Sequence, residues 1–375
     1  MLNTPIIFVS DNSKLTDLAE SIIYKKPKFL PMDTEFERRN SYYPIISLLQ
    51  LEFEGKAYVI DALNSDISIL NDVFLCKNIT KVFHSAYQDI EALFFKLRIK
   101  LYPVIDSQVA LTIAGFGLSI SYESALLKVM NVEIDKKYQT FMSWLKRPLP
   151  MGVIEYAGYD VVYLGELFIK ALSIVESKGL TEWLVEIMDN AYHDYNFDDN
   201  NESAWQKFYG KILNSHNFGI KKCRVAYAIS TWRENLSKKN NIARQHTLND
   251  DVIIRIAGRF PVEKDLFMEI IKGAIDRKLK VSDEEILNLY NDLNENLPEI
   301  PDPKTIWRFS ISLPLANEFT DYKIRVKELF KNEKIPIRWF CTEEELYEYF
   351  ISRRKNLPHD WDKTWRGNFI KKIYA

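Results

Sequence analysis

Two acidic residues interrupt an otherwise apolar segment near the start of the chain, in the stretch FLPMDTEF at residues 29–36. If this segment is a strand, Asp33 and Glu35 point to the same face, because side chains two apart on a strand share a face. Burying two unpaired carboxylates costs on the order of several kcal/mol each. A divalent cation between them would offset this cost, since hard cations take oxygen ligands. The alternative is that one carboxylate caps a backbone group and the other faces water.

Short strands alternate with helices in the first half of the chain. Runs of β-branched and aromatic residues predict strands at 5–10, 28–36, 46–55, 57–63 and 79–84. Apolar residues at helical spacing predict helices at 12–24, 87–97, 121–130 and 151–176. Glu54 and Gly55 predict a hairpin turn between two of the strands. This order indicates a mixed α/β sheet flanked by helices.

The second half of the chain has a helical pattern from about residue 177 onward. Residues 198–203 are polar and predict a linker into a helix that begins near Trp205, and the prolines of 294–305 predict a further break. We therefore expect three domains, at 1–195, 204–276 and 281–373, of which the last two are helical.

Basic residues are concentrated in one block of a chain whose net charge is only −2. Residues 204–280 carry 16 Lys and Arg against 7 Asp and Glu. Such a block is a candidate contact surface for a polyanion such as a nucleic acid. The alternative is a solvated helical face with no ligand.

The three cysteines, Cys76, Cys223 and Cys341, lie far apart in the sequence and indicate neither a disulfide framework nor a zinc site. The N-terminal residues lack the pattern of a signal peptide, and no run of about 18 apolar residues could span a bilayer. We expect a soluble protein of the reducing cytoplasm.

A further acidic residue lies at the start of the helix expected at 87–97. The strand before it ends at His84 and Ser85, and Ser85 is the expected N-cap of the helix. Asp89 would then lie in the first turn, where it could reach a cation held by the neighbouring strand. The alternative role of Asp89 is to complement the helix dipole. His84 alone is typical of a hydrogen-bonded residue at a strand end.

Tyr156 and Asp160 are four residues apart in the helix expected at 151–176, so they lie on one face of it. A phenol and a carboxylate one turn apart can together hold and orient a water molecule bound to a metal ion. The alternative is an ordinary Tyr–Asp contact at the surface.

These three segments resemble a known set of motifs. DTEFERRNSYYP, HSAYQD and YAGYDVVYL, in this order, resemble the three exonuclease motifs of the DEDD superfamily in its tyrosine-bearing branch, and most closely those of the ribonuclease D family. The intervening LLQL at 48–51, VIDSQVA at 104–110 and the segment at 121–150 extend the resemblance. Two positions depart from the family pattern: Ser107 replaces a usual threonine, and Val153 replaces a common glutamine.

The resemblance implies a ribonuclease-H-like exonuclease domain that works with two divalent metal ions, Mg²⁺ or Mn²⁺. One ion would be held by Asp33, Glu35 and Asp160 and would activate a water molecule that Tyr156 orients. The second ion would be bridged by Asp33 and would reach Asp89 partly through water. The expected catalytic residues are thus Asp33, Glu35, Asp89, Tyr156 and Asp160, and the four carboxylates among them are the expected metal ligands.

The helical half resembles the nucleic-acid-binding HRDC domain, in residues 224–261. A second, degenerate copy is expected to end at 341–370 and mainly to pack. Phosphate contacts by basic side chains give affinity without reading sequence, and Phe36, Tyr42 and Tyr43 could stack on terminal bases, or simply pack. The expected substrate-binding residues are Phe36, Tyr43, His84, Lys221, Lys222, Arg224 and Arg244.

The implied activity is 3′→5′ exoribonuclease cleavage that releases nucleoside 5′-monophosphates. The implied substrate is RNA with a single-stranded 3′ end, chiefly tRNA precursors, and nothing in the sequence indicates a membrane or an obligate protein partner. Two alternatives stay open: a 3′→5′ DNA exonuclease, and a non-catalytic RNA-binding scaffold built on the helical half.

Overall fold

The computed structural model describes residues 4–134, 144–193, 195, 197, 204–205, 208–209, 218–276, 279–300, 313–332 and 340–371. The chain divides into two compact units. The first, which we call the α/β unit, comprises Met1–Phe36, Ile46–Asn196 and Ser310–Ala375. The second, which we call the helical unit, comprises Glu37–Ile45 and Phe197–Phe309.

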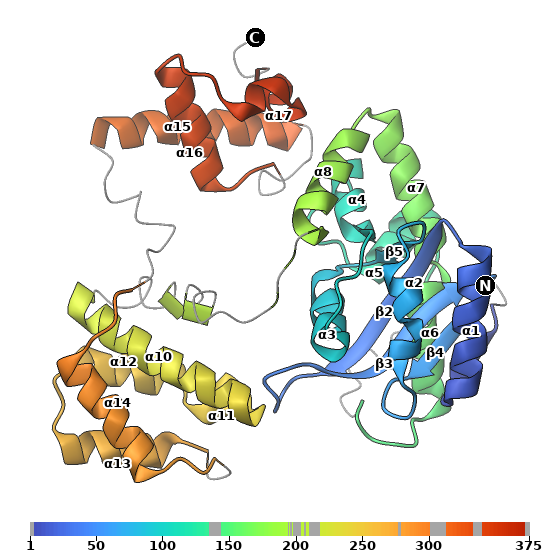
Figure 1. Ribbon diagram of the computed structural model, residues 1–375. Helices are drawn as coiled ribbons and strands as arrows, with labels where there is room; N and C mark the ends of the chain where they lie inside the picture. The colour runs from blue at the N-terminus through green and yellow to red at the C-terminus, as the bar shows by residue number, and fades with distance from the viewer. Residues whose placement is uncertain are drawn as a thin grey trace. The chain divides into compact units, whose positions relative to one another are not determined.

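A six-stranded mixed sheet forms the centre of the α/β unit, with the strand order β1-β4-β3-β2-β5-β6 (Figure 1). The strands are β1 (Ile6–Val9), β2 (Phe29–Glu37), β3 (Ile45–Phe53), β4 (Lys56–Asp61), β5 (Thr80–Phe83) and β6 (Val104–Asp106). β3 and β4 form the predicted antiparallel hairpin, and its turn residues Glu54 and Gly55 have φ of 50° and 72°. The five predicted strands are confirmed, and β6 is an addition.

Parallel pairing brings the acidic segments to one edge of the sheet. β2 pairs with β5 in the register Phe29↔Thr80 and Pro31↔Val82, and β5 pairs in parallel with β6. The carboxyl ends of these strands therefore meet at the same edge. Asp33 and Glu35 lie in the second half of β2, and the helix that carries Asp89 follows the end of β5.

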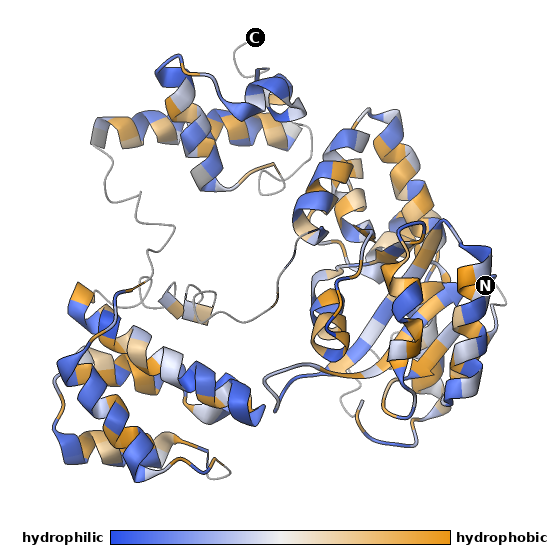
Figure 2. Cartoon of the chain, in the orientation of Figure 1, coloured by the Kyte–Doolittle hydropathy of each residue, from blue (hydrophilic) through white to orange (hydrophobic). Residues whose placement is uncertain are grey.

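In the described residues of the α/β unit, eight α-helices lie between the N-terminus and Tyr192. They are α1 (Asn12–Lys25), α2 (Asn71–Leu75), α3 (Tyr87–Leu97), α4 (Ser107–Ala114), α5 (Tyr122–Ala125), α6 (Met151–Val162), α7 (Leu164–Ser177) and α8 (Thr181–Tyr192). The single helix predicted at 151–176 is wrong in one respect, because the chain breaks at Tyr163 into α6 and α7. The apolar sides of these helices face inward (Figure 2).

α6 packs on β1 and β4. Gly158 makes this approach possible, because a Cβ atom at that position would lie 2.9 Å from the side chain of Ile6 in β1. The core under α6 contains Leu48 and Val59 from the sheet and Ala157 from the helix. The helix that carries Tyr156 and Asp160 is thereby fixed close to the sheet.

The α/β unit also includes the C-terminal helices α15 (Leu313–Asn332), α16 (Glu343–Arg354) and α17 (Trp365–Ile370). Trp365 of α17 packs against Trp183 of α8, with ring centroids 4.0 Å apart. Glu343 forms an ion pair with Lys323 at 2.6 Å, and Glu345 closes a capping box with Thr342. The acidic start of α16 therefore has structural partners, as expected for a segment that mainly packs.

The helical unit contains α10 (Ile220–Asn240), α11 (Arg244–Thr247), α12 (Asp250–Arg259), α13 (Lys264–Ala274) and α14 (Asp283–Glu295). Its core includes Trp205, Ile229, Ile253 and Phe267 together with Ile286, Leu289 and Leu293 of α14. The domain boundary predicted between residues 276 and 281 is therefore wrong for α14. The apolar face of this helix completes the core of the first helical module instead of starting the second.

Two other predicted features cannot be compared with the fold: the linker at 198–203 and the last prolines of 294–305 lie outside the described residues. Within the part of the chain that the structure describes, no helix is both long enough and apolar enough to cross a membrane.

Candidate active site

Three carboxylates converge at the edge of the sheet. Single oxygen atoms of Asp33, Glu35 and Asp160 all lie within 4.8 Å of one another. Asp33 and Glu35 come from β2, where strand alternation puts them on one face. Asp160 comes from α6, which is held close to the sheet by the contact of Gly158 with Ile6. The structure thus brings together three of the four metal ligands expected from the sequence.

Burial and mutual repulsion raise the pKa values of the carboxyl groups in this cluster. Burial, followed by the charges of Asp89, Asp160 and Glu35, raises the pKa of Asp33 well above its ordinary value. Burial, followed by Asp160 and Asp89, does the same to the pKa of Glu35. The pKa of Asp160 is raised to about 8, mainly by burial and then by the charges of Glu123 and Asp89.

The donor set suits a hard divalent cation. It offers only carboxylate oxygens, which are the ligands that Mg²⁺ and Mn²⁺ prefer. A cation would also remove the cost of holding several charged carboxylates in a partly buried site. A divalent-metal centre therefore fits the residues present.

Asp89, the fourth carboxylate, lies in the first turn of α3 and is 7% exposed. Its Oδ1 atom accepts hydrogen bonds from the hydroxyl of Thr34 at 2.6 Å and from the backbone N–H of Thr34 at 3.2 Å. Asp89 is therefore attached to β2 between Asp33 and Glu35, while lying outside the three-carboxylate cluster. Burial raises the pKa of Asp89 to about 7.

The N-terminal end of α3 is capped by a residue that the sequence did not suggest. The prediction that Ser85 is the N-cap is wrong, because Ser85 adopts a φ of 68° and α3 begins only at Tyr87. Instead, Asp106 at the end of β6 accepts from the backbone N–H groups of Ser85 at 2.9 Å and Ala86 at 3.0 Å. A carboxylate at this place also complements the helix dipole.

Tyr156 lies one turn before Asp160 on α6 and is partly exposed. Burial, followed by the charges of Asp160 and Glu35, raises its pKa above the ordinary value. The phenol therefore stays protonated near neutral pH and can donate a hydrogen bond. Tyr122 lies near the same charges, since its pKa is raised by burial and then by Asp160, and its hydroxyl donates to the Tyr159 carbonyl at 3.4 Å.

His84 has structural partners for both ring nitrogens. Nδ1 lies 2.8 Å from the Ser107 hydroxyl, and Nε2 lies 2.9 Å from the carbonyl oxygen of Ile120. Burial lowers the pKa of this imidazole. The structure thus favours the strand-end interpretation of His84, and its predicted contact with substrate would require these bonds to break.

The aromatic residues after Glu35 divide between the two units. Phe36 is partly exposed at the end of the first segment of the α/β unit. Tyr42 and Tyr43 belong to the loop 37–45, which is part of the helical unit. Tyr42 is buried there, and the backbone N–H of Tyr43 donates to the Asn241 side chain at 3.0 Å. Base stacking by Phe36 and Tyr43 stays a prediction.

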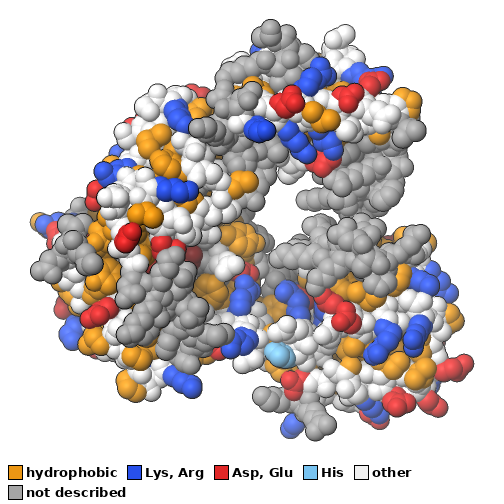
Figure 3. All heavy atoms as spheres, turned by 180° about the vertical axis from the view of Figure 1, so that it is seen from behind, with side chains coloured by type: hydrophobic (Ala, Val, Ile, Leu, Met, Phe, Trp, Pro, Cys, Tyr) orange, Lys and Arg blue, Asp and Glu red, His pale blue; other side chains and the backbone are white. Residues whose placement is uncertain are grey.

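Several of the basic residues expected to hold phosphates have partners within the helical unit. Arg224 forms an ion pair with Glu299 at 2.5 Å, and Lys222 donates to the carbonyl oxygen of Gly258 at 2.7 Å. Arg244 forms an ion pair with Glu234 at 2.6 Å. Lys221 is exposed. Basic and acidic side chains are interspersed on the visible face of this unit (Figure 3), so phosphate contacts by these residues stay a prediction.

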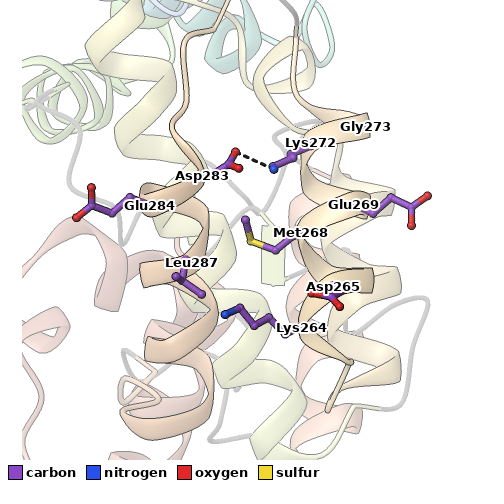
Figure 4. Close-up of a pocket in the computed structure, with 9 residues that line it drawn as sticks. All are labelled: Lys264, Asp265, Met268, Glu269, Lys272, Gly273, Asp283, Glu284 and Leu287. Atoms are coloured by element: carbon purple, nitrogen blue, oxygen red, sulfur yellow. Dashed lines mark ion pairs between the residues drawn. The ribbon is translucent and has the colours of Figure 1, made fainter.

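A groove of about 960 Å³ lies elsewhere, between α13 and α14 of the helical unit (Figure 4). Met268 and Leu287 line it together with charged residues of both signs, and Lys272 pairs with Asp283 at 2.7 Å across it. This groove has none of the clustered carboxylates of the sheet edge and is not the candidate active site.

Sequence reasoning missed three residues that shape the site: Thr34, Asp106 and Tyr122. Thr34 could have been suspected from its place between two acidic residues. Asp106 and Tyr122 could not, because only the tertiary fold brings β6 to the start of α3, and α5 to the neighbourhood of Asp160.

Comparisons with known proteins agree with this geometry. A family model described as a 3′-5′ exonuclease matches residues 6–176. Ribonuclease D of Nitrobacter hamburgensis is 32% identical over 232 residues, which are 61% of this chain and 59% of that protein. Ribonuclease D of Bartonella henselae is 31% identical over 255 residues, 67% of this chain and 61% of that protein. The chain thus matches about three fifths of the length of these relatives.

Solved structures show the same fold along almost the whole chain. The crystal structure of Escherichia coli RNase D superposes with a TM-score of 0.74 at 20% identity and covers 98% of this chain and 97% of that one. The catalytic core of RRP6 from Trypanosoma brucei gives a TM-score of 0.59 at 20% identity, with 80% and 82% covered. The expected fold class, an α/β exonuclease domain followed by helical domains, is confirmed. Residues 6–176 match the 3′-5′ exonuclease family, and the chain is similar to ribonuclease D over about three fifths of the length of those relatives.

Proposed function

We propose that this protein is a 3′→5′ exoribonuclease that removes nucleotides one at a time from RNA with a single-stranded 3′ end. The observation that carries the proposal is the convergence of Asp33, Glu35 and Asp160 to within 4.8 Å. Asp89 lies beside β2, and Tyr156 lies one turn from Asp160. The similarity of residues 6–176 to 3′-5′ exonucleases supports this reaction class for the constellation.

The four carboxylates would hold two divalent ions, Mg²⁺ or Mn²⁺. Bound there, the ions would supply positive charge to the phosphate oxygens and make water a stronger nucleophile at neutral pH. Asp33, Glu35 and Asp160 would form the tighter of the two positions because their oxygens are already grouped. Asp89 would contribute to the other position with Asp33, whose electrostatic neighbour it is.

The reaction is hydrolysis of the last phosphodiester bond. The oxygen of a water molecule attacks the phosphorus atom, the bond from phosphorus to the 3′ oxygen breaks, and the departing 3′ oxygen takes up a proton. The products are a nucleoside 5′-monophosphate and an RNA shortened by one residue with a new 3′-hydroxyl. The protonated phenol of Tyr156 would hydrogen-bond the attacking water and fix its direction.

The substrate is proposed from the relatives. E. coli RNase D is an exoribonuclease involved in structured RNA processing, and we extend that role to this chain, with tRNA precursors as the main substrates in the cytoplasm. Exposed basic residues of the helical unit, of which Lys221 is one, would hold the RNA backbone through phosphate contacts that do not depend on sequence.

A matched pair of single-stranded oligomers, RNA and DNA of one sequence and labelled at the 5′ end, tests the proposal with the full chain. We expect Mg²⁺-dependent shortening of the RNA in single-nucleotide steps, loss of activity in EDTA, and loss of at least about 10²-fold in Asp33→Asn. Glu155→Gln is the control, because Glu155 is exposed on the same helix as Tyr156.

Three results would replace the proposal. Faster shortening of the DNA would make the protein a DNA exonuclease. Equal RNA shortening in wild type and Asp33→Asn would remove the catalytic assignment, and RNA binding without shortening in the wild type would indicate a scaffold.

A further inference from the structure

Thr34 is the residue between the two acidic residues of β2, and strand alternation directs its side chain to the opposite face from Asp33 and Glu35. It is 6% exposed, and its hydroxyl lies 2.6 Å from Oδ1 of Asp89. Its backbone N–H lies 3.2 Å from the same oxygen. One residue thus supplies two donors to one oxygen of Asp89.

The two oxygens of the Asp89 carboxylate therefore have different surroundings. A carboxylate is an acceptor with two oxygens, and Oδ1 is engaged by Thr34. Both hydrogen bonds from Thr34 go to Oδ1, and neither engages Oδ2. A carboxylate pinned at one oxygen cannot rotate freely, so the direction of its other oxygen is fixed as well.

The fixed direction matters because Asp89 is the carboxylate that stands apart. Asp33, Glu35 and Asp160 form their cluster without it. If Asp89 were free to turn, its charge could move toward the other three or away into solvent. Thr34 prevents both movements, since its backbone is part of the same strand as Asp33 and Glu35.

We propose that Thr34 is a positioning residue for the reaction: it holds Asp89 by one oxygen and thereby presents the other oxygen to the second divalent cation. This inference rests on the proposed function, because it assigns a role within the same metal centre. The hydroxyl is the part of Thr34 that a substitution can remove, and it makes the shorter of the two contacts. Partners that orient metal ligands in this way are typically worth about 10–100-fold in metal affinity.

The test is a titration of the full chain with Mn²⁺ in the absence of nucleic acid, followed by electron paramagnetic resonance of the free ion. The wild type should bind two ions. Thr34→Val keeps the shape of the side chain but removes the donor, so it should weaken the looser site about 10–100-fold and leave the tighter site unchanged. Thr34→Ala should act like Thr34→Val, which covers the case that the valine variant does not fold. Thr34→Ser restores the hydroxyl and should restore the looser site.

Kinetics give a second readout. In Thr34→Val the kcat for RNA shortening at fixed Mg²⁺ should fall, should recover partly at high Mg²⁺, and the KM for RNA should stay unchanged. Wild-type Mn²⁺ binding and kcat in both Thr34→Val and Thr34→Ala would overturn the inference and leave the proposed function intact. Equal weakening of both sites in all three variants, serine included, would also overturn it. A wild type that binds no Mn²⁺ and shortens no RNA would instead overturn the proposed function itself.

Discussion

Tyr42 donates a 2.5 Å hydrogen bond to Glu234, although the two residues are 192 positions apart in the sequence. Arg244 completes the contact. It pairs with Glu234 at 2.6 Å, donates to the Tyr42 hydroxyl at 2.9 Å and lies over the Tyr42 ring. The loop 37–45, which follows the strand carrying Asp33 and Glu35, is thereby attached to the helices of the helical unit.

Arg244 is therefore expected to stabilise the fold. Arg244→Ala leaves the charge of Glu234, which is 1% exposed, without its cation. The free energy of unfolding should fall by about 2–3 kcal/mol, less than for a fully buried pair because Arg244 is partly exposed. Urea unfolding of the full chain measures this, with exposed Lys239→Ala as a control that should change it by less than about 0.5 kcal/mol. Unchanged stability with weakened RNA binding would favour the phosphate role predicted from the sequence.

Tyr156→Phe should reduce kcat by about 10²-fold with little change in the KM for RNA, because only the hydroxyl that orients the attacking water is lost. Single-turnover RNA hydrolysis and thermal unfolding of the same preparation check this. Glu155→Gln should have wild-type kinetics. A wild-type rate in Tyr156→Phe would show that the phenol takes no part.

The stability of the metal-free protein should fall as the pH rises from about 4 to 8. The folded chain raises the pKa of Asp89 to about 7 and that of Asp160 to about 8, so over this range it binds more protons than the unfolded chain. A divalent cation reverses the effect by pairing with the ionised carboxylates. Mg²⁺ should therefore raise the melting temperature more at pH 8 than at pH 5.5, as thermal unfolding with and without EDTA can show. If Mg²⁺ raised the melting temperature of Asp160→Asn as much as that of the wild type, the rise would not come from pairing of the cation with this carboxylate.

Asp106→Asn should weaken both folding and catalysis. Asp106 accepts hydrogen bonds from the backbone of Ser85, Ala86 and Gln108, and an amide has only one oxygen for them. We expect a loss of about 1–3 kcal/mol in the free energy of unfolding. We also expect a lower kcat, because the start of α3 carries Asp89. Asp72→Asn, in the exposed first turn of α2, is the control and should affect neither.

Ile286→Ala should destabilise the helical unit by about 2–5 kcal/mol, because Ile286 of α14 is 1% exposed in its core. The exposed neighbour Asn288 provides the control, Asn288→Ala. Denaturant unfolding of the full chain, followed by Trp fluorescence, reports the change. An unchanged free energy of unfolding in Ile286→Ala would indicate that α14 belongs to the second helical module, as predicted from the sequence.

The sheet and the clustered carboxylates of β2 and α6 were predictable because local patterns encode them. Asp33 and Glu35 are identified by a strand that is otherwise apolar, and Tyr156 and Asp160 by the spacing of a helix turn. β6 was missed because three residues give too short a pattern. The boundary at 276 was misplaced because Ser282 and Asp283 mark a helix start, whereas only packing shows which core that helix completes.

Contacts between distant segments could not be predicted. From the sequence, Arg224 and Arg244 were expected to be available for phosphate contacts, because they lie in a basic block. In the folded chain they form ion pairs with Glu299 and Glu234. His84 was expected to contact RNA, but its two ring nitrogens form hydrogen bonds with the Ser107 hydroxyl and the Ile120 carbonyl oxygen. Charge counts along a sequence thus overestimate the surface that remains for a polyanion.

Gly158 lets α6 lie close to β1, since an added methyl group would meet the Ile6 side chain at 2.9 Å. The helix bears Tyr156 and Asp160 on either side of this glycine. The absence of a side chain at Gly158 therefore sets how closely Asp160 approaches Asp33 and Glu35 of β2. An alanine at this position would require either the helix or the Ile6 side chain to shift. The grouping of the Asp33, Glu35 and Asp160 carboxylates thus depends on the absence of a Cβ atom at position 158.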